Sequence, residues 1–137
     1  MVKSNVFSTC QIQHQPKKIS SQKLLTKIIQ QINRDFTVGA ELEFFLLQRA
    51  NHKQALFTAI IDELKQLKIK TGDIISETGN EQYEIDFIHH NEPLKLAADI
   101  ITTKQVIIKH AANFNIEVSF AAKPLARQDV GNALHIH

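Results

Sequence analysis

Two glutamates lie two residues apart in an otherwise apolar run, Val-Gly-Ala-Glu-Leu-Glu-Phe-Phe-Leu-Leu at positions 38–47. Side chains alternate across a β-strand, so Glu41 and Glu43 must share one face while Leu42 and Phe44 share the other. Burying a carboxylate without a counter-charge is costly or forces its neutralisation. The run therefore predicts one of two structures: a strand whose glutamates face water, as in many antiparallel sheets, or a strand whose paired carboxylates hold a divalent cation.

Composition limits the kinds of partner that the chain can have. The 137 residues fit one domain, and 43% hydrophobic residues are enough for a core. The 16 Lys and Arg against 14 Asp and Glu are scattered along the chain, which argues against nucleic acid as a partner. A single cysteine, Cys10, excludes an internal disulfide and fits a reducing compartment. No apolar run approaches the roughly 20 residues that cross a bilayer, so we expect no membrane partner and a cytoplasmic location.

The order of secondary structure follows from hydrophobic periodicity. Apolar residues at three-and-four spacing predict three helices, capped by Ser20, Asn51 and Asn91 and running to about residues 34, 70 and 113. Alternating patterns predict strands at 38–47, 73–76, 82–88, 116–121 and 133–137. This order of helix, strand, helix, two strands, helix and two strands favours an α+β fold or a partly closed barrel-like sheet with helices on its outer side.

Two features concern the ends of the chain. Residues 1–19 show little periodicity, so we expect an irregular N-terminal arm followed by one domain at 20–137. The alternating pattern still continues at His137, with no turn or polar tail after it. We therefore expect that a longer protein has been cut at this point.

Polar residues on the predicted strands come in same-face pairs. Glu41 pairs with Glu43, Glu77 pairs with Glu84 across a short loop, and two histidines alternate in the last strand. Four carboxylates with imidazole form a hard, oxygen-rich environment, which suits Mg²⁺ or Mn²⁺ better than zinc. Such sites usually serve phosphate chemistry, although the chain has neither a GxxxxGK[ST] loop nor a GxGxxG motif. The alternative is that these acids lie on solvated strand faces.

Three segments resemble the catalytic domain of glutamine synthetase and its relatives, the γ-glutamyl-amine ligases, from about Ser20 onward. Segment 38–46 is similar to the family's Gly-Pro-Glu-x-Glu-Phe-Phe strand. Segment 77–85, Glu-Thr-Gly-Asn-Glu-Gln-Tyr-Glu-Ile, is similar to its Glu-x-x-Pro-Gly-Gln-x-Glu element. Ala-Lys-Pro at 122–124 and Gly-Asn-Ala-Leu-His-Ile-His at 131–137 are similar to its Lys-Pro and Gly-Ser-Gly-Met-His-x-His elements. The order and spacing of all three segments carry the resemblance.

The resemblance implies a set of metal ligands. By it, Glu43, Glu77 and Glu84 ligate one divalent ion, Mg²⁺ or Mn²⁺. Glu41 and His135 contribute to a second ion. The fold that it implies is a curved, mainly antiparallel sheet, half of an active-site barrel, flanked by about three helices.

The resemblance also implies substrates and partners. His137 would lie near the nucleotide phosphates, and Gly131 would contact the amino-acid substrate through its backbone. The implied reaction is ATP-dependent: the γ-carboxylate of glutamate is phosphorylated, and ammonia or an amine displaces the phosphate. Members of the family assemble into rings, so the full-length protein is expected to be a homo-oligomer. We expect the 137-residue chain to be part of such a ligase and to be inactive by itself.

Departures from the family motifs leave the acceptor open between ammonia and an amine. Asn80 and Glu81 replace Pro-Gly in the second motif, and Val130 precedes Gly131 where glutamine synthetases have an asparagine. The Gln-Tyr-Glu-Ile run at 82–85 is similar to the γ-glutamyl-polyamine branch. A competing hypothesis is a non-catalytic or regulatory remnant that keeps a metal or nucleotide pocket of the same fold.

Overall fold

The computed structural model describes residues 20–32, 35–127 and 129–137. The irregular arm expected at 1–19 lies outside the described residues. The chain divides into two compact units, one ending at Ile32 and the other spanning 33–137, and each is treated separately below. The domain boundary expected at residue 20 stays a prediction.

The first unit contains helix α1 (Ser21–Gln31). Its cap is the one that the sequence predicts, because the Ser20 hydroxyl oxygen accepts a hydrogen bond from the Lys23 backbone N–H at 3.3 Å. Part of the apolar stripe of the helix is exposed, with Leu24 51% and Ile28 44% accessible, while Leu25 and Ile29 are half-buried. Amphipathic periodicity therefore predicts the helix correctly, although no described residue of α1 is buried.

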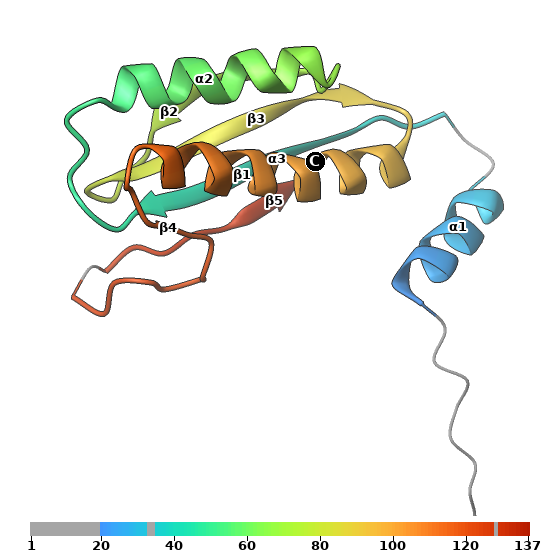
Figure 1. The fold of residues 1–137 in the computed structure, drawn as a ribbon. Helices are drawn as coiled ribbons and strands as arrows, with labels where there is room; N and C mark the ends of the chain where they lie inside the picture. Colours follow the sequence, from blue (N-terminus) through green and yellow to red (C-terminus); the bar gives the residue numbers. More distant parts are fainter. Residues whose placement is uncertain (1–19, 33–34, 128) are drawn as a thin grey trace, which may run out of the picture. The chain divides into compact units, whose positions relative to one another are not determined.

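The second unit is an open antiparallel sheet with two helices on one face (Figure 1). Strand order is β2-β3-β1-β4, and β5 also pairs with β1. The observed order of elements confirms the predicted α+β fold. The bounds of the strands are β1 (Val38–Leu46), β2 (Thr71–Ser76), β3 (Gln82–His90), β4 (Val118–Ser119) and β5 (Leu134–Ile136). The helices are α2 (Lys53–Gln66) and α3 (Pro93–Asn113).

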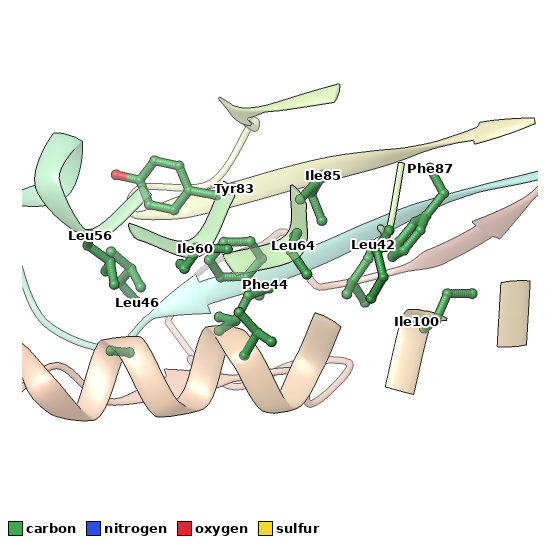
Figure 2. Close-up of a cluster of buried hydrophobic side chains, with 14 of the residues drawn as sticks. Leu42, Phe44, Leu46, Leu56, Ile60, Leu64, Tyr83, Ile85, Phe87 and Ile100 are labelled. Carbon is green, nitrogen blue, oxygen red and sulfur yellow. The ribbon is translucent and has the colours of Figure 1, made fainter. Parts of the chain in front are cut away.

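Alternation on β1 divides its side chains between two environments. Leu42, Phe44 and Leu46 are at most 1% exposed and pack under α2 and α3 (Figure 2). The Phe44 ring lies 6.0 Å from the Tyr83 ring of β3, centroid to centroid, within the range of favourable aromatic pairs. Because successive side chains of a strand point to opposite faces, this core holds the polar residues of β1 on the face away from the helices.

The helix boundaries differ from the predicted ones at four points, one of which is the end of α1, at Gln31 and not at about residue 34. The first intrahelical bonds of α2 and α3 are accepted by the carbonyls of His52 and Glu92, so these residues, and not Asn51 or Asn91, occupy the cap positions. Helix α2 ends at Gln66, earlier than predicted, and β2 already begins at Thr71. None of the described helices combines the length and apolar character needed to cross a membrane.

Thr103 on α3 offers a test of the core. Its side chain is fully buried, and its hydroxyl oxygen has no hydrogen-bond partner. We expect Thr103→Val, which has nearly the same shape, to raise the free energy of unfolding by about 1 kcal/mol because it removes an unsatisfied buried polar group. Urea denaturation measures this change, with Thr102→Val as the control because the Thr102 hydroxyl donates to the Ala98 carbonyl. A lower free energy of unfolding in Thr103→Val than in the wild type would contradict the conclusion that the buried Thr103 hydroxyl has no hydrogen-bond partner.

Candidate metal centre

Strand register brings the predicted acids together on the face of the sheet away from the helices. Glu43 of β1 lies opposite Glu84 of β3, and Glu41 lies opposite both Asp86 of β3 and His135 of β5. One ligand atom from each of Glu41, Glu84 and His135 lies within 4.8 Å of the other two. These three residues, called the acid–imidazole cluster below, come from three strands that are far apart in sequence.

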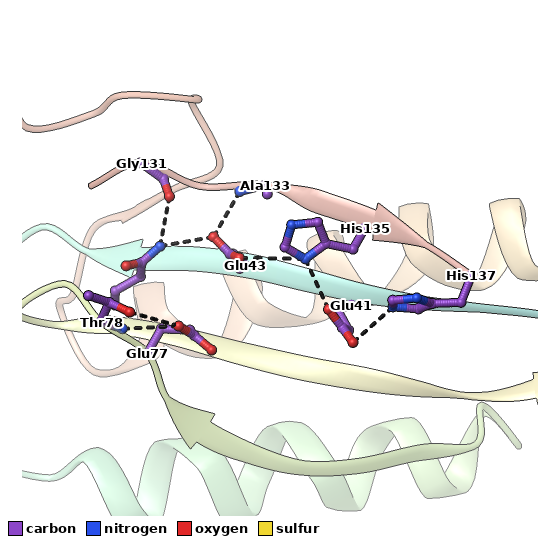
Figure 3. A network of polar contacts seen from close by, with 9 residues as sticks. Glu41, Glu43, Glu77, Thr78, Gly131, Ala133, His135 and His137 are labelled. Carbon is purple, nitrogen blue, oxygen red and sulfur yellow. Dashed lines mark hydrogen bonds and ion pairs between the residues drawn. The ribbon is translucent and has the colours of Figure 1, made fainter. Parts of the chain in front are cut away.

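Glu43 lies beside the cluster and is held by two donors. The residue is 8% exposed. Its Oε2 accepts hydrogen bonds from Gln82 Nε2 at 2.9 Å and from the backbone N–H of Ala133 at 2.8 Å (Figure 3). Its Oε1 lies 3.8 Å from His135 Nδ1. Glu43 is therefore fixed through one oxygen, while the other faces the cluster.

Glu41 is bracketed by the two histidines at the end of the chain (Figure 3). Its Oε2 lies 2.9 Å from His135 Nδ1, and its Oε1 lies 2.8 Å from His137 Nε2. Both imidazoles are about half exposed. The His137 ring also lies 6.2 Å from the His89 ring, centroid to centroid. The predicted same-face pairing of His135 and His137 thus places both beside one carboxylate.

Glu84 has the most perturbed ionisation at this centre. Burial, followed by the negative charges of Glu41, Glu77, Asp86 and Glu43 in that order, raises the pKa of its carboxyl from 4.5 to about 7. Within the described residues, no lysine or arginine forms an ion pair with these acids; the ion-pair partners of Glu41 and Glu43 are histidines. A crowded, partly buried group of carboxylates without a fixed cation is chemically suited to a bound one.

Glu77 and Gly131 lie at the margin of the centre. Glu77 Oε2 accepts hydrogen bonds from the N–H and hydroxyl of Thr78, and Glu77 is not among the described residues whose ligand atoms converge within 4.8 Å. The Gly131 carbonyl accepts a hydrogen bond from Gln82 Nε2 at 2.9 Å. The structure thus groups Glu41, Glu84 and His135, and places the other predicted residues around them.

Sequence reasoning missed one polar residue of the centre, Gln82. It is 3% exposed and contacts Glu43 and Gly131. The available signal was alternation, because Gln82 precedes Glu84 by two residues and must share its strand face. An amide carries no charge, so this side chain is less conspicuous in the sequence than the carboxylates beside it.

The donor set fits a hard divalent cation. Carboxylate oxygens dominate, joined by imidazole, and cysteine is absent from the acid–imidazole cluster. Mg²⁺ and Mn²⁺ prefer such oxygen-rich surroundings. The residues that could hold an ion directly are Glu41, Glu84 and His135, with the free oxygen of Glu43 next to them.

Comparisons with known proteins match this chain to one family. Residues 48–137 match the family "Glutamine synthetase, catalytic domain". Gamma-glutamylputrescine synthetase PuuA of Escherichia coli (strain K12) is 31% identical over 78 residues, which cover 56% of this chain and 16% of that protein. Glutamine synthetase of Methanocaldococcus jannaschii is 27% identical over 135 residues, covering 83% of this chain and 29% of that protein. The chain therefore spans less than a third of the length of these relatives.

Solved structures agree on the fold. The cryo-EM structure of Plasmodium falciparum glutamine synthetase superposes with a TM-score of 0.65 at 19% identity, over 73% of this chain and 29% of that one. A glutamine synthase homologue superposes with a TM-score of 0.62 at 22% identity, over 74% and 26% of the two chains. The match over residues 48–137, more than half of the chain, shows that the chain belongs to the glutamine synthetase catalytic-domain family.

Proposed function

We propose that this chain provides metal-binding residues of a glutamine-synthetase-like ligase, which joins ammonia or an amine to the γ-carboxylate of glutamate at the expense of ATP. Family membership supports the class of reaction. The observation that carries the proposal is the convergence of Glu41, Glu84 and His135 within 4.8 Å beside the anchored carboxylate of Glu43.

The proposed chemistry has two steps. The γ-carboxylate of glutamate attacks the γ-phosphorus of ATP, the bond to the β,γ-bridging oxygen breaks, and γ-glutamyl phosphate and ADP result. Ammonia or an amine then attacks the acyl carbon, loses a proton and expels phosphate. Bound Mg²⁺ or Mn²⁺ supplies charge neutralisation for the phosphoryl group. The residues of this chain would hold the ion in the position from which it neutralises the charge of the phosphoryl group.

The proposed roles follow the family motifs. Glu43, Glu77 and Glu84 would hold one ion, while Glu41 and His135 would contribute to a second. The position of Glu84 supports two neighbouring ions, because its carboxylate lies within reach of Glu41 and His135 as well as opposite Glu43.

Substrate contacts complete the proposal. His137 would face the nucleotide phosphates, and the Gly131 backbone would contact glutamate. The similarity to gamma-glutamylputrescine synthetase PuuA supports an amine acceptor, and the similarity to glutamine synthetases supports ammonia. We propose that the full-length protein acts as a cytoplasmic homo-oligomer.

Glu41→Gln tests the metal centre directly. We expect this change to weaken Mn²⁺ binding by about 10-fold to 100-fold, because a charged oxygen ligand becomes a neutral amide. Isothermal titration calorimetry of the metal-free protein measures the affinity. Glu117→Gln is the matched control, since it removes the same charge from an exposed residue outside the cluster. Equal Mn²⁺ affinity in the wild type and Glu41→Gln would refute the proposed role.

A further inference from the structure

Gln82 begins β3 and is almost completely buried, yet its side chain is polar. Its amide contacts three separate segments. Oε1 accepts a hydrogen bond from the Gly79 N–H at 2.9 Å, and Nε2 donates to Glu43 Oε2 at 2.9 Å and to the Gly131 carbonyl at 2.9 Å. One side chain thus joins the β2–β3 loop, strand β1 and the segment before β5.

The partners determine which way the amide points. The Gly79 N–H can only donate, whereas the Gly131 carbonyl and the Glu43 carboxylate can only accept. Turning the amide over would place its oxygen against two acceptors and its NH₂ group against a donor. The three contacts therefore form only with the amide in this one orientation.

We propose that Gln82 is a positioning residue of the metal centre, an inference that rests on the function proposed above. Its amide holds Glu43 Oε2 in place, which leaves Oε1 directed toward the acid–imidazole cluster. Because the amide is neutral, it fixes this carboxylate without cancelling the negative charge that a cation needs. An arginine or lysine at this position would supply a competing positive charge.

The same amide sets the position of two neighbouring elements. Glu77 precedes Gly79 by two residues, so the Gly79 contact restrains the loop that carries this predicted ligand. The Gly131 contact restrains the segment whose Ala133 N–H is the second donor to Glu43. Gln82 therefore ties together the three segments that must keep a fixed spacing around a cation.

Gln82→Met tests this role, because methionine has a similar length and no hydrogen-bonding amide. We expect Mn²⁺ affinity, measured by calorimetry on the 137-residue chain, to fall by about 10-fold to 100-fold, as for other residues that orient metal ligands. Hydrogen exchange of the Gly79 amide should accelerate by about 10-fold. Gln48→Met is the matched control, since the Gln48 amide donates to the Asn115 carbonyl away from the centre.

The outcomes separate the two proposals. Absence of Mn²⁺ binding in the wild type would overturn the proposed function and this inference with it. Mn²⁺ binding that is equal in the wild type and Gln82→Met would overturn the inference alone, even if Gly79 exchange accelerates, since that result describes a purely structural side chain.

A second measurement applies if Gln82→Met does not fold. In the wild-type protein, the side-chain amide resonances of Gln82 should shift during a Mg²⁺ titration, because their acceptor Glu43 lies at the centre. The amide resonances of Gln48 should stay in place. Unchanged Gln82 resonances during metal binding would overturn the inference.

Discussion

Glu84→Gln is expected to raise the free energy of unfolding of the metal-free protein at pH 8 by about 3 kcal/mol. The physical reason is the raised pKa of the Glu84 carboxyl, about 7 in the folded protein against an ordinary value of 4.5. An acid with a raised pKa holds its proton more tightly in the folded state. The stability that comes from this tighter proton binding is fully present below pH 4.5 and is lost as the pH rises through about 7.

The wild-type protein should therefore lose stability between pH 4.5 and 7, whereas Glu84→Gln should show a flatter profile over this range. Urea denaturation without metal at several pH values measures both. Glu117→Gln, an equal charge change at an exposed residue, should keep the wild-type slope. Mn²⁺ should stabilise the wild type at pH 8 and have much less effect on Glu84→Gln. An unchanged slope in Glu84→Gln would contradict the raised pKa.

Gly131→Ala is expected to detach the C-terminal strand from the sheet. A Cβ at Gly131 would lie 2.0 Å from the Ala122 carbonyl oxygen, far inside the roughly 3.5 Å of ordinary contact. That oxygen is backbone and already accepts a hydrogen bond from the Asn132 N–H at 2.9 Å, so it cannot swing away as a side chain would. We expect the free energy of opening the β1–β5 pairing to fall by about 3 kcal/mol.

Hydrogen exchange measures this opening through the amides that pair the two segments. The Gly39 and His137 amides, which bond to each other's carbonyls, should exchange about 100-fold faster in Gly131→Ala. Gly72→Ala is the control, because a Cβ there would meet its nearest neighbour, Asp86 Cβ, at an ordinary 3.7 Å. Wild-type exchange rates in Gly131→Ala would show that the segment tolerates a side chain.

Local pattern was enough for most of the fold. Alternation predicts β1 and β3, and the three-and-four spacing predicts all three helices, because both periods express which side of an element meets the core. Boundaries were less well predicted. The sequence predicts a strand at 116–121, but only Val118–Ser119 pairs with β1. The pairing is short because β1 ends at Leu46 and already pairs with β5 through residues 40–42.

Only the tertiary structure decided how the site is assembled. Glu84 and His135 could be assigned to strand faces from alternation, but their positions opposite Glu43 and Glu41 depend on pairings between segments far apart in sequence. Register of this kind is set by the packing of the buried face, because a slip of one residue would turn Leu42 out of the core.

The sequence by itself determined the composition of the candidate metal centre: Glu41 and Glu43 at alternate positions of one strand, Glu77 and Glu84 on either side of a loop, and two histidines at alternate positions of another strand. The tertiary structure decided which of them converge. It grouped Glu41, Glu84 and His135, left Glu77 hydrogen-bonded to its neighbour Thr78, and buried Gln82 in contact with Glu43, Gly79 and Gly131. The physical reason is that periodicity is a property of one segment, whereas burial and charge crowding arise only when strands pair.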